Sequence, residues 1–242
     1  MGHFLAVSAF RTEQVDELCQ RIAGYCRSSD VGCEVRESAD DLSDETDATV
    51  YSPENGWVRV IWPNHFTAND FPLCENLSKQ AALVVSTVHT YDGEYWEHLF
   101  LDRGDVLHKF CSWPDYDVGS EEEAVKAKAE WRGDPTQLAE FLGIPAESIS
   151  GYMVHLSPPP AEPPPKKSIF SWLTGKSQPQ PQPQFVVETH KAYDADHFDL
   201  EDFWVFTDFW AKLGIVYPDP WDQGIGCLLR FEPNWWKKLP SM

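Results

Sequence analysis

The stretch LVVSTVHTYDGEYWEHLFLDRGDVLHKFC, which runs from Leu83 to Cys111, contains three strand-like segments in succession. They cover residues 83–91, 94–101 and 106–111, and each is rich in β-branched and aromatic side chains. Asp92-Gly93 and Arg103-Gly104 separate them, and both pairs suit two-residue turns. The pattern predicts a β-meander.

The chain before the meander adds strands and helices in alternation. A strand is expected over 4–10, a helix with apolar residues every three or four positions over 12–25, and a second helix over 70–79. Pro53-Glu54-Asn55-Gly56 joins two further strand-like runs into a hairpin. We therefore expect an α+β fold: a mixed or antiparallel sheet with a βαββαβ-like start, then the meander, with helices packed on one face.

The chain after the meander begins with helix signals and continues with proline. Ser120 and Glu123 form a capping box before a helix that ends near Trp131, and Asp134-Pro135 opens a helix that Gly143 closes. Residues 157–184 hold nine of the 19 prolines, a composition typical of unpacked chain.

This composition divides the chain into three parts. We expect a main α+β domain over 1–156, a Pro-rich disordered linker or insertion over 157–184, and a strand-helix segment over 185–242 that docks on the main domain. Tyr152 to Leu156 and Phe185 to Tyr193 are expected to be neighbouring strands of one sheet.

Charge is the strongest compositional signal. The sequence has 39 Asp and Glu against 19 Lys and Arg, a formal net charge of -20. Such a field repels nucleic acid and anionic lipid, and it attracts a basic protein. No apolar run approaches the roughly 20 residues that cross a bilayer. We expect a cytoplasmic protein whose partner is a protein, with nucleic acid unfavoured.

The six cysteines form no CxxC pair, so neither a zinc ribbon nor a small disulfide framework is indicated. Reduced, buried thiols are expected. The sequence also lacks a nucleophile elbow, P-loop, GxGxxG and HExxH motif. We therefore expect no bound cofactor, and a catalytic role is less favoured than a binding role.

The meander does carry one candidate metal site, formed by His89, His98 and Glu97. With a two-residue turn at Asp92-Gly93, His98 would lie diagonal to His89 on one sheet face, and His108 would lie on the other face. A metal-dependent hydrolase is the alternative function. A polar outer face of the sheet is the simpler explanation of the same residues.

Candidate partner-binding residues come from the densest acidic runs and from one basic-aromatic segment. Residues 37–47 hold six carboxylates and no base, without the spacing or glycine of an EF-hand calcium loop. Trp172 lies in a segment with three lysines inside the Pro-rich tract. The candidates are Asp40, Asp41, Asp44, Glu45, Glu121, Glu122, Glu123 and Trp172.

Residues 137–152 resemble the helix-turn-helix of phage-repressor-type regulators, through Gln137-Leu-Ala-Glu-Phe-Leu-Gly-Ile144 and Ile149-Ser-Gly-Tyr152. The resemblance implies a second helix that enters the major groove. Here that region holds Glu147 and no base, so an ordinary pair of short helices closed by Gly143 is preferred. A DNA-binding regulator is the third hypothesis.

The leading hypothesis is a non-enzymatic acidic protein that binds a basic protein. Bacterial immunity proteins, which neutralise toxins, are the most concrete class with a small α+β form and strong acidity, by analogy at the level of the fold.

Overall fold

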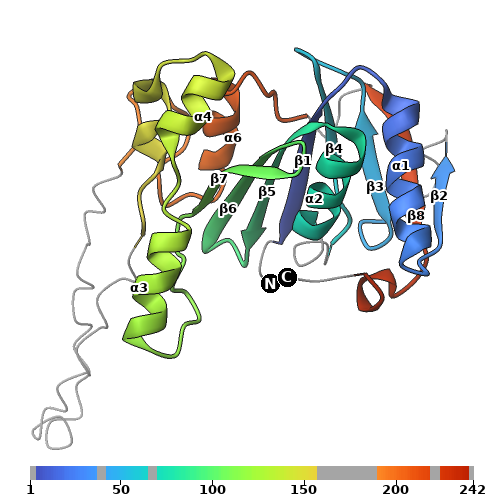
Figure 1. Ribbon diagram of the computed structural model, residues 1–242, viewed down its shortest axis with the longest axis horizontal. Helices are drawn as coiled ribbons and strands as arrows, with labels where there is room; N and C mark the ends of the chain where they lie inside the picture. Colours follow the sequence, from blue (N-terminus) through green and yellow to red (C-terminus); the bar gives the residue numbers. More distant parts are fainter. Residues whose placement is uncertain (1–3, 37–41, 65–69, 157–189, 219–223, 240–242) are drawn as a thin grey trace, which may run out of the picture.

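The computed structural model describes residues 4–36, 42–64, 70–156, 190–218 and 224–239 (Figure 1). Eight strands form one antiparallel sheet in the order β2-β8-β3-β4-β1-β5-β6-β7. The strands are β1 (Leu5–Arg11), β2 (Cys33–Arg36), β3 (Asp47–Tyr51), β4 (Trp57–Ile61), β5 (Val84–Tyr91), β6 (Tyr95–Asp102), β7 (Asp105–Cys111) and β8 (Ile225–Phe231). The predicted α+β class, with helices packed on a sheet, is confirmed.

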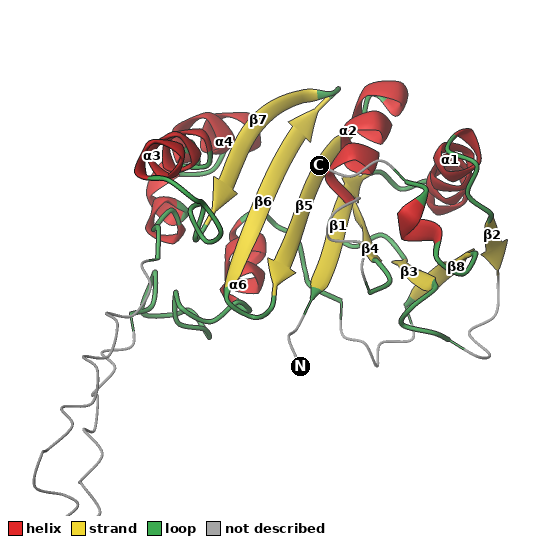
Figure 2. Cartoon of the chain, turned by 90° about the horizontal axis from the view of Figure 1, so that it is seen from below, coloured by secondary structure: helices red, strands yellow, loops and turns green. Residues whose placement is uncertain are grey.

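Helices α1 (Val15–Ser28) and α2 (Asp70–Ala81) cover one face of the sheet (Figure 2). The buried side of α1 includes Leu18 and Ile22, which repeat at helical spacing. They pack in one apolar cluster with Ala6 and Phe10, which point to the same face of β1 because side chains alternate along a strand. No helix in these described ranges is long and apolar enough to span a bilayer.

The opposite face is covered by α4 (Pro135–Leu142) and α6 (Val205–Lys212). The aromatic side chains of α6 reach the meander, and Phe209 lies at the centre. Its ring centroid lies 5.5 Å from that of Trp96, 4.9 Å from that of His98 and 5.6 Å from that of Tyr152. A second apolar core therefore joins the meander to a segment about 100 residues further along the chain.

The end of the chain completes the sheet. β8 pairs with β2 on one side and β3 on the other, and neither β2 nor β8 was predicted. The described parts of the two strands expected beside the Pro-rich tract, 152–156 and 190–193, are not strands, so that prediction is wrong there. The Pro-rich tract, 157–184, lies outside the described residues.

The meander forms as predicted, but each of its two turns is followed by one extra residue. Glu94 donates its backbone N–H to the Tyr91 carbonyl at 2.9 Å, yet Tyr91 pairs with Tyr95, so Glu94 is left out of the register. The Arg103-Gly104 turn joins paired Asp102 and Asp105, and a β-bulge follows at Phe100/Leu101. Each extra residue changes which side chains share a face.

The capping predictions for α3 (Glu121–Glu130) and α4 are confirmed, whereas α1 begins after Gln14 without a side-chain cap. Ser120 caps α3 by accepting the Glu123 N–H, and Asp134 caps α4 by accepting the Gln137 N–H. Gly143 ends α4 with a φ of 71°, in the left-handed region that glycine adopts without strain.

The prediction of reduced thiols is wrong for two of the six cysteines. Cys19 of α1 and Cys227 of β8 form a disulfide across a sequence separation of 208 residues. Linear spacing gives no sign of this contact, because it exists only once β8 has joined the sheet. Cys26, Cys33, Cys74 and Cys111 are buried and remain thiols.

Replacing Phe209 by alanine should lower the free energy of unfolding by about 3–5 kcal/mol, the usual cost of removing a fully buried Phe. The side chain is 0% exposed, and its neighbours belong to three separate segments. Phe141→Ala is the control, because Phe141 is 38% exposed. Urea unfolding measures both. A similar loss for the two variants would contradict the central position given to Phe209.

Candidate functional site

The predicted metal residues are divided between the two faces of the meander. His89 lies opposite Glu97, whereas His98 lies opposite Val88, which is the next pair of the antiparallel ladder. Adjacent residues of a strand point to opposite faces. His89 and Glu97 therefore share one face, and the expected placement of His98 on the face of His89 is wrong. The cause is Glu94, which shifts the pairing by one residue.

On the face covered by α2, Glu97 is the centre of a buried polar network. His89 forms an ion pair with Glu97, and Phe71 of α2 stacks on the His89 ring with a centroid distance of 4.6 Å. The Cys111 thiol also hydrogen-bonds to Glu97. Burial alone would raise the pKa of Glu97, but the charge of His89 and the two hydrogen bonds hold it below its usual range.

The chemistry of this network is that of a structural ion pair. Burial and the Glu97 charge raise the pKa of the Cys111 thiol, which keeps it protonated. Only the thiolate is a strong nucleophile, so Cys111 in this state is inert. His89 is paired with the Glu97 carboxylate through Nε2.

On the opposite face, four side chains form one buried chain of hydrogen bonds. Ser86 Oγ lies 2.8 Å from His98 Nε2, the Nδ1 atoms of His98 and His108 are 3.0 Å apart, and His108 Nε2 lies 3.3 Å from Met153 Sδ. A thioether has no hydrogen to donate, so His108 must donate from Nε2 and accept at Nδ1. His98 then donates from Nδ1 and accepts the Ser86 hydroxyl. This is the one arrangement that satisfies every contact.

Both imidazoles must be neutral in this arrangement. His108 shares the face of His98, contrary to expectation, because the β-bulge places it opposite Phe100. Burial lowers the pKa of His108 to about 4, and burial together with His108 lowers the pKa of His98 well below its usual value. If His108 were protonated at Nδ1, its Nδ1–H would face the Nδ1–H of His98, and the hydrogen bond between the two rings would be lost.

Neither group of side chains forms a metal centre. No set of three or more His, Cys, Asp and Glu in the described ranges could hold a metal ion. The Nδ1 atoms of His98 and His108 hydrogen-bond to one another, and His89 lies on the opposite face of the sheet.

An exposed aromatic surface at the closed end of the β5–β6 hairpin was missed by sequence reasoning. Tyr91 and Tyr95 stack with their ring centroids 5.5 Å apart, and Tyr116 lies 5.2 Å from Tyr95. Trp113 and Phe4 contact the two ends of this row at 5.0 Å each. We call Tyr91, Tyr95 and Tyr116 the tyrosine cluster. Its signal was the sequence Tyr91-Asp-Gly-Glu-Tyr95, an aromatic pair that flanks an acidic turn.

Carboxylates surround the tyrosine cluster. Asp92, Glu94 and Asp117 are exposed. Partial burial raises the pKa of Tyr116, and the charges of Glu94, Asp92 and Asp117, together with Tyr91, raise it further. Asp115 differs, since Lys128 of α3 lies 2.7 Å from its carboxylate. The loop from Trp113 to Ser120 leads directly into α3, and so this acidic rim continues into Glu121, Glu122 and Glu123, which are all exposed.

Helix α3 has no buried residue. Val125 on its surface is 65% exposed. Ion pairs hold the helix instead, from Lys109 to Glu130 and from Lys128 to Asp115, each at 2.7 Å. In Figure 1 the helix extends away from the sheet beside the lower end of β6.

The second predicted acidic run lies elsewhere. Asp44 and Glu45 are exposed just before β3, and Glu45 accepts a hydrogen bond from Trp235 Nε1 at 3.1 Å through its carbonyl. β3 and β7 are separated by four strands in the sheet, so this run is not part of the α3 surface. Asp40, Asp41 and Trp172 lie outside the described residues.

The helix-turn-helix expectation fails at its second element. Between the end of α4 and residue 156 the chain makes two single 3₁₀ turns, η2 (Ala146–Ser148) and η3 (Ser150–Tyr152), and no second α-helix. Tyr152 is buried, and Gly151 donates its N–H to the Tyr193 hydroxyl at 2.9 Å. Ile149 and Tyr152, at the position of a recognition helix, therefore pack into the core.

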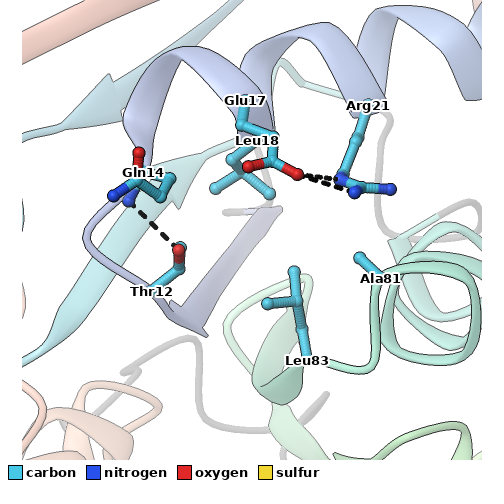
Figure 3. Close-up of a pocket in the computed structure, with 7 residues that line it drawn as sticks. All are labelled: Thr12, Gln14, Glu17, Leu18, Arg21, Ala81 and Leu83. Carbon is cyan, nitrogen blue, oxygen red and sulfur yellow. Dashed lines mark hydrogen bonds and ion pairs between the residues drawn. The ribbon is translucent and has the colours of Figure 1, made fainter.

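The hollow between the start of α1 and the end of α2, about 190 Å³, contains none of the predicted site residues (Figure 3). Its one cation, Arg21, is engaged by Glu17 at 2.6 Å. Thr12 accepts the Gln14 N–H at the edge of this hollow.

Comparison of the chain with known protein families, curated proteins and solved structures finds no match.

The buried histidine pair should make the protein sensitive to acid. The unfolded chain protonates His108 near pH 6.5, but the folded chain does so only near pH 4. This contribution to stability is present above pH 6.5 and is lost as pH falls toward 4, by about 3 kcal/mol at about 1.4 kcal/mol per unit of pKa. Urea midpoints between pH 7 and 4 measure it.

The variant His98→Leu/His108→Leu should flatten this part of the pH dependence. His190→Gln, at an exposed position, is the control and should retain the wild-type slope. A double variant that loses stability with acid as steeply as the wild type would contradict the assignment.

Proposed function

We propose that this protein binds a basic protein partner through α3 and the loop that precedes it. The observation that carries the proposal is a helix with no buried residue, three exposed glutamates in its first turn, and exposed aromatic rings beside it. Aromatic anchors with a charged rim are the usual composition of protein interfaces. Immunity proteins that neutralise basic toxins are the class this arrangement suits best.

The glutamates have a local role as well, which does not account for the whole surface. Acidic side chains at a helix N-terminus interact favourably with the helix dipole. That effect explains why three glutamates lie in the first turn of α3, but it does not explain why Val125, Tyr91 and Tyr116 are exposed. A helix held by two ion pairs, without apolar packing, gains most from a partner that covers it.

The net charge supports a fast encounter with such a partner. A formal charge of -20 attracts a basic protein over the screening length, about 10 Å at 0.1 M salt and about 3 Å at 1 M. The acidic run near Asp44 adds to this long-range field. The contact surface itself is assigned to α3 and the loop before it, because the exposed rings of Tyr91 and Tyr116 lie there beside a dense set of exposed carboxylates.

Replacing Glu121, Glu122 and Glu123 together by glutamine should slow association with a basic probe severalfold, while dissociation changes less. Glutamine at position 123 keeps the capping partner of Ser120, so the helix is retained. The probe is a ten-residue arginine peptide that carries a fluorescent dye, and stopped-flow fluorescence of the dye follows its binding. The rate should also fall steeply from 0.1 to 1 M salt.

The matched control is Glu13→Gln/Asp16→Asn/Glu34→Gln, which removes three exposed acids near α1 and β2. It should slow association much less. Equal slowing by both triple variants would assign the effect to net charge alone and would contradict a site at α3.

A further inference from the structure

The tyrosine cluster has an arrangement that core packing does not explain. Tyr91 and Tyr116 are 40% and 38% exposed, although each ring contacts two or more other rings. The stacked pair is nearly parallel, with 17° between the planes, and Tyr116 is inclined to both rings by 62° and 51°. The rings are thus held in fixed orientations at the surface.

The surroundings of these rings are negative. Asp92, Glu94 and Asp117 act on Tyr116 from the hairpin turn and from its own loop. In the part of the chain that the structure describes, three cations lie over aromatic rings, and those rings are Trp57, Trp131 and Tyr193. The tyrosine cluster therefore presents π faces and carboxylates with no cation of the described chain over them.

A cation is the ligand that both features favour. Aromatic faces attract positive charge, and nearby carboxylates accept its hydrogen bonds. Between the two cationic side chains, arginine suits this surface better, because its planar guanidinium stacks on a ring while it donates in its own plane. Lysine offers a compact, strongly hydrated charge without a stacking plane.

We propose that the tyrosine cluster seats an arginine side chain of the partner, stacked on a tyrosine ring and hydrogen-bonded to the carboxylates of the hairpin turn and the loop before α3. The inference rests on the proposed function, since it names the anchor within that interface. The inference specifies that the partner inserts arginine, whereas charge attraction alone would accept arginine or lysine equally.

The test compares two substitutions of one ring with two probe peptides. Tyr116→Leu removes the π face and keeps apolar bulk, whereas Tyr116→Phe keeps the face. The ten-residue arginine peptide should bind Tyr116→Leu about three- to fivefold more weakly than the wild type, as expected for an exposed cation–π contact. Tyr116→Phe should bind it with nearly the wild-type affinity. Tyr91→Leu provides a second test at a separate ring.

The lysine peptide of equal length should lose less than twofold on Tyr116→Leu. An equal loss for both peptides would overturn the assignment to arginine. Unchanged affinity of Tyr116→Leu and Tyr91→Leu for the arginine peptide would overturn the inference. If the triple glutamine variant of α3 still slows association in that case, the proposed function stands. If the triple glutamine variant does not slow association either, both the inference and the proposed function fail. Circular dichroism verifies that each variant is folded.

Discussion

The alternation of side chains along β5, β6 and β7 is the constraint on which the rest of the structure depends. Each strand directs every second residue to the α1–α2 face and the others to the α4–α6 face, so a change of one residue in register exchanges the two sets. Two single-residue irregularities, at Glu94 and near Leu107, set this register. They place Glu97 with His89 on one face and His98 with His108 on the other.

The two faces consequently have different chemistry. One contains an ion pair beneath Phe71 and leads outward to the tyrosine cluster and its carboxylates. The other contains neutral imidazoles beneath Phe209, where burial disfavours the charged form. The polar residues of the meander are therefore mainly structural within the sheet, and the surface available to a partner begins where the strands end.

The sequence allowed the meander, the first hairpin, the helix caps and the fold class to be predicted, because turn and capping residues act locally. β2 and β8 were missed for a different reason. Four residues, Cys33 to Arg36, show no clear pattern, and Ile225 to Phe231 becomes a strand only by insertion between β2 and β3. The disulfide between Cys19 and Cys227 depends on the same long-range pairing. The predicted strand register of the meander was wrong because the sequence of a turn does not reveal a bulge beside it.

The candidate site was predicted in part. Glu121 to Glu123 were identified from charge, whereas Tyr116 joins Tyr91 only through tertiary structure, some 25 residues along the chain. Hydrogen exchange with and without the ten-residue arginine peptide tests the central claim most directly. Binding at the proposed interface should protect residues 91–95 and 112–123 most. Protection spread evenly over the exposed acidic segments, or concentrated near Asp44 and Glu45, would contradict it.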